Sequence, residues 1–359
     1  MSDPTASNAR RRRSELSVAE GDTTRGRRPM RRRVWFGLAI VLLTTLAACS
    51  TKQSPSIVDP KGTEAHTISG IWWLMCGLAS GVYLVVGGFI LVAAFRGRRT
   101  ETGKPSRVRD STFIVVGGLI VPAAILLVLG VQVVHASNTL RQPEKDPLHI
   151  EVVGKRWWWA VSYPDQKITT ADEVHVPVGR PLEIGLDSDN VIHSFWIPQL
   201  GGKVDMIPGQ HNVWRVTATK PGLYRGECAE YCGLEHARMN FVVVAQTAAD
   251  FDAWLVRHQL PPSGPSDQLA ATGQMIFMRE PCAGCHTIRG TTADGTIGPD
   301  LTDIGSRLTL GANTVPNSEG YLSGWIVNSQ TMKPGNLMPP IPMSSSDLQA
   351  LVAYLRSLK

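Results

Sequence analysis

The chain has 359 residues, of which 43% are hydrophobic and 10 are tryptophan, so a mainly disordered protein is excluded and two or three modest domains can form. A net charge of +6 would suit a nucleic-acid-binding protein, but residues 1–48 contain ten arginines against four acidic residues. Residues 49–359 carry 26 basic and 26 acidic residues, so we expect no nucleic-acid partner.

The N-terminal segment has the pattern of an export signal. Residues 31–49 read RRRVWFGLAIVLLTTLAAC, a basic start followed by a short apolar run and small residues. Leu46-Ala47-Ala48-Cys49 resembles a bacterial lipobox, in which the cysteine is lipidated after cleavage. We therefore expect residues 1–48 to be an N-terminal extension and lipoprotein-like signal peptide, and 49–66 an exported linker. The alternative is an uncleaved anchor in which Cys49 has no role.

Two uncharged apolar stretches predict a transmembrane hairpin over residues 67–136. They cover 67–95 and 111–135, and a helix needs ~20 residues to cross a bilayer. The intervening RGRRTETGKPSRVRD has six basic and two acidic residues, and such loops stay in the cytoplasm. We expect a bacterial cell-membrane protein with two helices, whose N-terminus and C-terminal domains lie on the extracytoplasmic side.

From Pro147 the sequence changes to short β-rich runs separated by proline and glycine. Examples of these runs are LHIEVVG (148–154), EVHVPVG (173–179), PLEIGLDS (181–188), HNVWRVTA (211–218) and MNFVVVA (239–245). Many short strands with turn signals are typical of a sandwich or barrel, which can hold metal ligands on loops at one end. We expect such a domain over residues 147–246.

One loop of this domain gathers soft metal ligands. It contains Cys228, Cys232, His236 and Met239, and His193 lies upstream in NVIHSFW. Thiolate and thioether groups suit copper, and imidazole completes the set. A blue mononuclear site needs one cysteine, so this set offers enough ligands for two thiolate-bridged coppers. A zinc site would need a second cysteine pair; a structural disulfide is the other alternative.

The pattern C-x-E-x-C-x-x-x-H-x-x-M resembles the CuA loop of cytochrome c oxidase subunit II, with every ligand position filled. The resemblance implies a cupredoxin-like fold with a binuclear copper centre, CuA. It implies that Cys228 and Cys232 bridge the coppers and that His193 and His236 each bind one. The weak outer ligands would be Met239 and the backbone carbonyl of Glu230.

The same resemblance implies two further roles. The Glu230 carboxylate would help to hold a magnesium ion at the interface with subunit I. The run Arg156-Trp157-Trp158-Trp159 is similar to the family's aromatic segment, which makes Trp157 the tryptophan where electrons enter CuA. The alternative for Trp157 is a purely structural role in core and interface packing.

The C-terminal part predicts a second soluble domain. A helix at 247–258 with a Thr247/Asp250 cap and the linker PPSGPS precede it, together covering 247–266. Residues 267–359 contain Cys282-Ala-Gly-Cys285-His286, the C-x-x-C-H motif of covalent haem attachment. A helix at 268–279, the turn at 298–301 and a closing amphipathic helix resemble an all-α class I cytochrome c domain.

The second axial ligand to the haem iron should be a methionine, since His/Met ligation raises the potential of a c-type haem. Met332, Met338 and Met343 are the candidates. KPGNLMPP resembles the Met-ligand loop of cytochromes c and favours Met338, with Cys282 and Cys285 holding the haem and His286 as the other axial ligand.

Two one-electron centres on domains outside a membrane indicate an electron relay. The resemblance implies subunit II of a caa3-like haem-copper cytochrome c oxidase. It would accept electrons from a c-type cytochrome or a bc-type complex and pass them through haem c and CuA to subunit I. In subunit I, dioxygen is reduced and protons are pumped. Other oxidase subunits are expected as further partners. The alternative is a standalone membrane-tethered electron carrier or copper-delivery protein.

Overall fold

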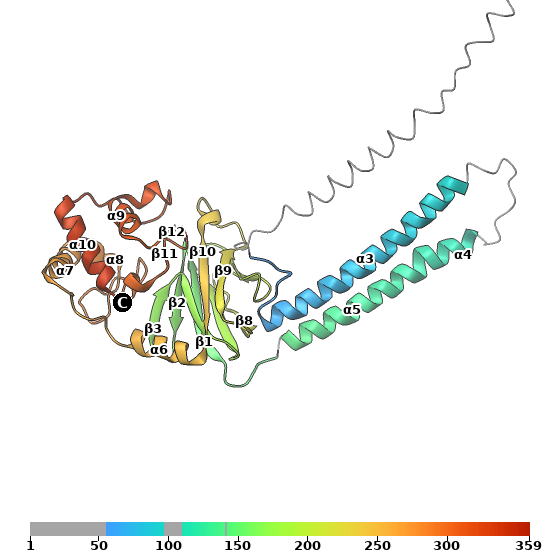
Figure 1. The fold of residues 1–359 in the computed structure, drawn as a ribbon, viewed down its shortest axis with the longest axis horizontal. Coiled ribbons are helices and arrows are strands. Elements are labelled where there is room, and N and C mark those ends of the chain that lie inside the picture. Colours follow the sequence, from blue (N-terminus) through green and yellow to red (C-terminus); the bar gives the residue numbers. More distant parts are fainter. Residues whose placement is uncertain (1–54, 97–109, 141) are drawn as a thin grey trace, which may run out of the picture. The chain divides into compact units, whose positions relative to one another are not determined.

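The computed structural model describes residues 55–96, 110–140 and 142–359, coloured by position along the chain in Figure 1. These residues form long apolar helices, a β-sandwich and a helical C-terminal domain, which confirms the expected multidomain fold class. The signal peptide, Cys49 and the basic loop at 97–109 lie outside the described residues.

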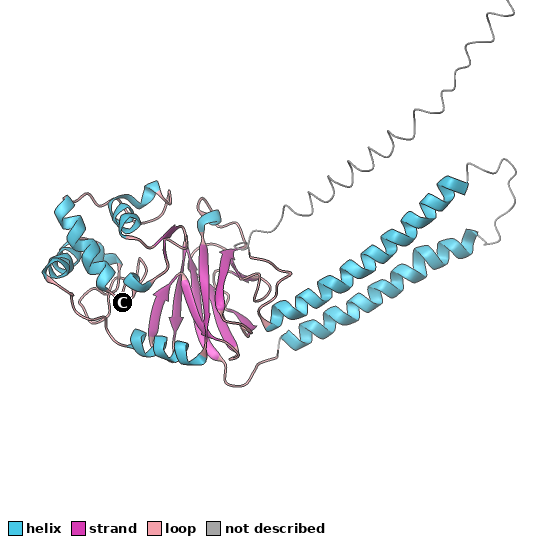
Figure 2. Cartoon of the chain, viewed as in Figure 1, coloured by secondary structure: helices cyan, strands magenta, loops and turns pink. Residues whose placement is uncertain are grey.

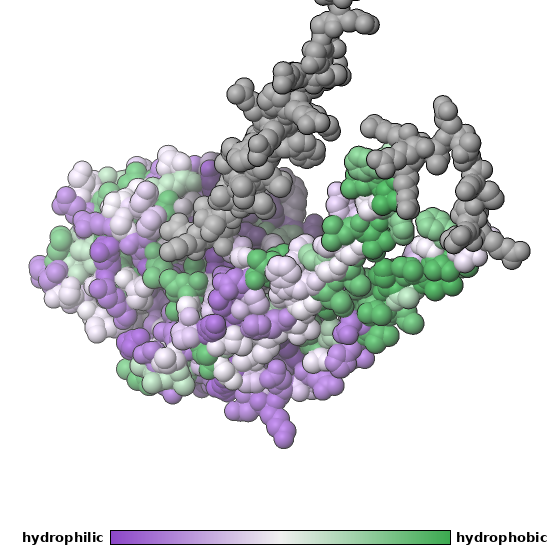
Figure 3. All heavy atoms as spheres, turned by 45° about the vertical axis from the view of Figure 1, so that its right-hand side comes forward, coloured by the Kyte–Doolittle hydropathy of each residue, from purple (hydrophilic) through white to green (hydrophobic). Residues whose placement is uncertain are grey.

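Two helical segments are long and apolar enough to cross a membrane. The first is α3 (Thr63–Arg96); the second consists of α4 (Asp110–Val115), a π-helical turn η2 (Val116–Ile120) and α5 (Val121–Leu140). Most of their large apolar side chains are exposed, and Figure 3 shows hydrophobic surface gathered over them. A helix that is apolar on all sides is typical of a membrane span.

The first helix begins before its apolar stretch, at Thr63 rather than 67, because its first turn is attached to the sandwich. The amide of Thr63 donates to the carbonyl of Thr217 at 3.0 Å, and the amide of Ala65 to that of Leu200 at 3.0 Å. The indole N–H of Trp214 also donates to the Glu64 carboxylate. These contacts fix the start of α3 to the β-sandwich domain.

The sandwich consists of two five-stranded sheets, drawn as magenta arrows in Figure 2. One sheet has the order β3-β2-β1-β5-β8, formed by Ile168–Ala171, Trp158–Tyr163, Leu148–Lys155, Leu182–Ser188 and Asn212–Val216. The other has the order β4-β10-β9-β6-β7, formed by Glu173–Pro177, Asn240–Gln246, Gly222–Cys228, His193–Trp196 and Val204–Met206.

Alternation of buried and open positions explains why these segments form strands. In β1 the side chains of Leu148, Ile150 and Val152 are buried and their neighbours are more open, as expected for a half-buried strand. Between the sheets, Trp159 of β2 contacts Phe241 of β10 with ring centroids 5.1 Å apart. The five β-rich runs all contain strands. The sandwich has five further strands, β2, β3, β6, β7 and β9.

The C-terminal domain is built around two crossing helices. Helix α7 (Gln268–Arg279) begins at Asp267, whose side chain accepts from the amide of Ala270. It packs against α10 (Ser345–Ser357); a Cβ on Gly273 would lie 1.9 Å from the Ala350 carbonyl oxygen, so only glycine allows this close approach. The other elements are α6 (Ala248–Gln259), which precedes the domain, α8 (Cys282–Cys285), β11 (Thr309–Leu310), β12 (Val315–Pro316) and α9 (Glu319–Asn328).

Candidate copper and haem sites

The expected copper ligands come together at one end of the second sheet. Cys228 is the last residue of β9, and the loop that follows returns at Met239 to start β10. The amide of Cys228 donates to the carbonyl of Met239 at 3.0 Å, which closes this loop at its base. His193 begins β6, which pairs with β9, so it lies beside Cys228 although 35 residues separate the two.

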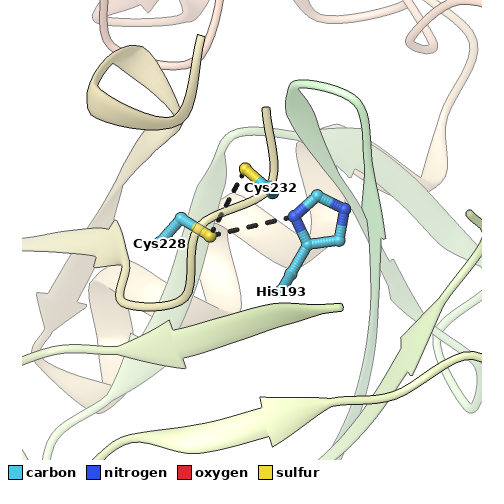
Figure 4. A group of neighbouring side chains, drawn as sticks. All are labelled: His193, Cys228 and Cys232. Atoms are coloured by element: carbon cyan, nitrogen blue, oxygen red, sulfur yellow. Dashed lines mark hydrogen bonds between the residues drawn. The ribbon is translucent and has the colours of Figure 1, made fainter. Parts of the chain in front are cut away.

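The side-chain geometry of this cluster suits a pair of bridged metal ions. The two cysteine Sγ atoms lie 3.8 Å apart, and Figure 4 shows them pointing toward each other and toward the His193 ring. The Nδ1 atom of His193 is 3.8 Å from Cys228 Sγ, and that of His236 is 3.7 Å from Cys232 Sγ. Each histidine thus lies beside one sulfur atom of the central pair.

The two weaker donors lie on opposite sides of the sulfur pair. Met239 Sδ is 3.7 Å from Cys232 Sγ, and the carbonyl oxygen of Glu230 is 3.2 Å from Cys228 Sγ. Each of the four outer donors therefore lies within 3.8 Å of one of the two sulfur atoms, and both cysteines and Met239 are buried. Soft sulfur donors with two imidazoles are the chemistry that copper prefers, so this donor set fits the implied metal.

The pKa values of the two thiols are shifted in opposite directions because the two groups interact directly. The neighbouring Cys232 thiol, followed by the His193 ring, lowers the pKa of Cys228 although burial opposes the shift. The contact with Cys228 and burial together raise the pKa of Cys232. A thiolate is the form that binds metal, and a cation bound to both sulfurs would offset the repulsion between two thiolates.

The predicted haem ligands line one cavity, which is bounded mainly by the C-terminal domain and also by Arg156, Trp157, Trp158 and Asp172 of the β-sandwich domain. Its walls are mainly apolar and include Phe277, Cys282, Cys285, His286, Ile297, Pro299, Leu301, Leu310, Leu322, Trp325, Met338, Ile341, Leu351 and Leu355. Of the three candidate methionines, Met338 lines this cavity, whereas Met332 packs toward Gly324 of α9. An apolar cavity with two thiols, an imidazole and a thioether fits a covalently attached haem.

The ring of His286 is held in one orientation. Its Nδ1 lies 2.7 Å from the carbonyl oxygen of Pro299, so Nδ1 carries the proton and donates, and Nε2 is left as the free ligand atom. Burial lowers the pKa of His286, which favours the neutral ring that binds iron. A Cβ on Gly298 would lie 2.5 Å from His286 Cε1, so the absence of a side chain there makes room for the ring.

Comparison with known proteins agrees with both halves of this arrangement. Residues 166–246 match the family described as cytochrome c oxidase subunit II, periplasmic domain, and residues 270–359 match the cytochrome c family. Cytochrome c oxidase subunit 2 of Alkalihalophilus pseudofirmus is 34% identical over 324 residues, covering 88% of this chain and 94% of the relative.

The chain belongs to the cytochrome c oxidase subunit 2 family. The subunit of the same name from Bacillus subtilis is 28% identical over 345 residues, covering 90% of this chain and 97% of that one. Among solved structures, the periplasmic domain of subunit II of cytochrome oxidase from Bradyrhizobium japonicum is 31% identical, with a TM-score of 0.32, and covers 33% of this chain and 96% of that one. The family matches and the Alkalihalophilus relative make the chain subunit II of a haem-copper oxidase with a cytochrome c domain.

Trp157 of this subunit II lies against the copper loop. Its indole Nε1–H donates to the carbonyl oxygen of Cys232 at 3.0 Å, and a Cβ on Gly233 would lie 3.1 Å from the ring. The ring therefore packs directly on the segment that follows the cysteine. The carboxylate of Glu230 is half-exposed and lies 3.9 Å from Lys203 Nζ, away from the sulfur pair that its carbonyl contacts.

Two supporting residues were not predicted from sequence. Asn190 Oδ1 lies 3.3 Å from Nε2 of His193, which directs Nδ1 of that ring toward the sulfur pair. A Cβ on Gly154 would lie 2.8 Å from the His193 ring, so this glycine makes room for it. Asparagine and glycine are common in loops and strands, so neither residue stands out in the sequence. Their roles depend on which strands become neighbours.

Proposed function

We propose that this chain is the electron-accepting subunit of a caa3-like cytochrome c oxidase, in which electrons pass through a haem c and then a binuclear CuA centre to subunit I. The observation that carries the proposal is that four CuA-type donors surround the sulfur pair of Cys228 and Cys232 while Trp157, bonded to the Cys232 carbonyl, also lines the haem cavity. One residue thus borders both candidate centres.

The residues have distinct tasks in this scheme. When bound, the copper pair and the haem would supply one-electron redox chemistry. Cys228 and Cys232 would hold the copper pair, with His193, His236, Met239 and the Glu230 carbonyl completing its ligand set. Cys282 and Cys285 would anchor the haem, and His286 with Met338 would complete its axial ligation. Because these side chains are buried or half-buried in packed domains, they need little rearrangement when an electron arrives.

The membrane arrangement belongs to the same proposal. Helices α3 and α5 would form the transmembrane hairpin, with residues 97–109 in the cytoplasm and both soluble domains on the extracytoplasmic side of a bacterial membrane. Cys49 would carry the lipid of a cleaved N-terminus. The half-exposed Glu230 carboxylate would share a magnesium ion with subunit I, where dioxygen is reduced and protons are pumped.

Charge suggests the kind of donor. Residues 146–260 carry fourteen acidic and ten basic residues, a balance that favours a basic c-type cytochrome, either soluble or part of a bc-type complex. The haem domain is nearly neutral, with seven acidic and six basic residues in 267–359, so we expect it to attract a charged donor only weakly over long range.

The test is purification of the full chain from its native membrane in detergent. The proposal expects a large polytopic partner, a c-type haem band, the mixed-valence copper signal and oxidation of reduced cytochrome c. A chain that purifies alone, with both centres loaded but without oxidase activity, would instead support the standalone carrier. Copper bound only transiently, without a c-type band, would support copper delivery.

A further inference from the structure

A buried lysine contributes to the attachment of the haem domain (residues 267–359) to the copper domain (residues 147–246). Lys333 is 2% exposed, and its Nζ donates three hydrogen bonds to backbone carbonyl oxygens. Two acceptors belong to the copper domain, the carbonyls of Trp157 at 2.7 Å and Arg238 at 2.8 Å, and the third is Gly311 of the haem domain at 2.8 Å. Lys333 therefore connects both domains at one point.

A buried carboxylate makes further bonds at the contact between the two domains. Asp172, in the copper domain, accepts from the amide of Trp159 at 2.8 Å and from the amide of Ala312, in the haem domain, at 2.9 Å. The amide of Asn240 in turn donates to the carbonyl of Ala312 at 3.2 Å. The β11–β12 turn of the haem domain is thus bonded to two segments of the copper domain, at Asp172 and at Asn240.

Two further contacts extend this interface. Glu173 of β4 accepts from the amide of Leu308 at 2.6 Å, and the Thr170 hydroxyl donates to the Asp303 carboxylate at 2.9 Å. Leu308 and Asp303 belong to the haem domain, whereas Glu173 and Thr170 belong to the copper domain. An interface with this many buried polar bonds has a defined geometry, unlike a loose contact between tethered domains.

The bonding capacity of Lys333 matches its surroundings. A buried ammonium is costly unless each N–H finds an acceptor, and here three donors meet three carbonyls. Burial lowers the pKa of Lys333 to about 8, with Asp172 and Glu235 opposing the shift, so the group is charged at neutral pH. Removing the side chain would leave three carbonyl oxygens without this partner.

Lys333 contacts Trp157, the residue that borders both candidate centres. It begins the loop that leads to Met338, and it holds the main chain of Trp157, whose indole is bonded to the Cys232 carbonyl. In the same loop, a Cβ on Gly335 would lie 3.7 Å from the Trp157 ring. The haem-domain loop therefore packs on one part of Trp157 while the copper loop contacts another.

We propose that Lys333 is a positioning residue that holds the haem domain on the main chain of Trp157, so that electrons reach the copper pair within one docked unit. The inference rests on the proposed function. The step moves one electron: the donor centre is oxidised by one unit, the acceptor centre is reduced by one unit, and no proton or co-reactant takes part. Docking replaces diffusion of a tethered domain by a fixed separation and orientation of the centres.

The test compares the detergent-purified complex with its Lys333→Met variant. Lys359→Met is the matched control, because Lys359 is the other lysine of the haem domain and is exposed. A protease site is inserted into the linker at 261–266 in each protein. The measurements are the optical and magnetic spectra of both centres, the rate of electron transfer from haem to copper after rapid photoreduction, and retention of the haem polypeptide after cleavage.

The inference expects Lys333→Met to keep both spectra, to lose at least tenfold in transfer rate, and to release the haem polypeptide after cleavage. Wild type and Lys359→Met should retain the polypeptide and the rate. Release from the cleaved wild type would overturn docking without relying on any variant, and so would wild-type transfer and retention in Lys333→Met. Absence of the copper or haem signal from the wild type would instead refute the proposed function.

Discussion

The indole N–H of Trp157 donates a 3.0 Å hydrogen bond to the carbonyl oxygen of Cys232, so the aromatic segment and the copper loop are directly connected. The two residues are 75 positions apart in the chain. The bond joins a side chain that borders the haem cavity to the backbone of a candidate copper ligand. Trp157 is therefore the point at which a change should affect transfer between the centres and leave the centres themselves intact.

Replacing Trp157 with phenylalanine should slow electron transfer from haem to copper. Phenylalanine keeps an aromatic ring in the packing but cannot donate to the Cys232 carbonyl. We expect unchanged spectra of both centres and a clear loss in the transfer rate after rapid photoreduction. Trp254→Phe, in α6, is the control and should transfer at the wild-type rate. Equal rates in the two variants would assign Trp157 a packing role alone.

Replacing Cys228 with serine should abolish the copper signal and leave the haem in place. A hydroxyl is a hard, weakly acidic donor and cannot bridge two copper ions as a thiolate does. The mixed-valence copper signal should disappear from the magnetic resonance spectrum, and the c-type optical band should remain. A copper signal that persists in Cys228→Ser would contradict the assignment of this loop.

Replacing Met338 with alanine should remove the Met-to-iron charge-transfer band and lower the reduction potential of the haem. A thioether ligand stabilises ferrous iron, so its loss favours the ferric state. Met332→Leu and Met343→Leu are the matched controls and should keep the band. Redox titration measures the potential. Loss of the band in one of the two controls, and not in Met338→Ala, would assign the axial ligand to the methionine replaced in that control.

Replacing Gly298 with alanine should disturb the axial histidine. The new methyl group would lie 2.5 Å from His286 Cε1, so the ring or the turn must shift. We expect a destabilisation of ~1–3 kcal/mol, as for other overpacked sites, with a changed Soret band. Gly320→Ala is the control, since a Cβ there meets no atom within 4 Å. Thermal unfolding followed at the haem band compares the two.

The haem domain should lose stability in acid through Asp303. Burial alone would raise the pKa of Asp303, but Arg307 and His258 hold it well below the ordinary value. A carboxyl whose pKa is lower in the folded state stabilises the protein above about pH 4 and loses this contribution as pH falls further.

Asp303→Asn should therefore lower the free energy of unfolding at pH 7 by about 3 kcal/mol and reduce the difference between pH 7 and pH 3.5. Denaturant titrations followed at the haem band measure both quantities. Asp294→Asn, at an exposed position of the same domain, should behave like the wild type. A variant with the full pH dependence of the wild type would show that Asp303 is not its source.

The sequence by itself determined the fold class and the candidate ligands. The long uncharged stretches predict the helices, and alternating apolar residues predict many of the strands. The spacings around Cys228 and Cys282 identify ligands because those motifs are local: a loop of twelve residues keeps its donors close in any compact fold. The family comparisons confirm the membership that those spacings indicated.

Only the tertiary structure decided how the two domains meet. Asp172 and Ala312 belong to no motif, and the KPGNLMPP motif that begins at Lys333 does not show what this lysine bonds to. The partners lie far away in sequence, up to 176 residues for the bond from Lys333 to Trp157. Such contacts depend on which strand ends and turns become neighbours after folding, and local pattern carries no information about that. The residues that bind the cofactors can be read from the chain, whereas the contacts that hold the two domains together are known only from the fold.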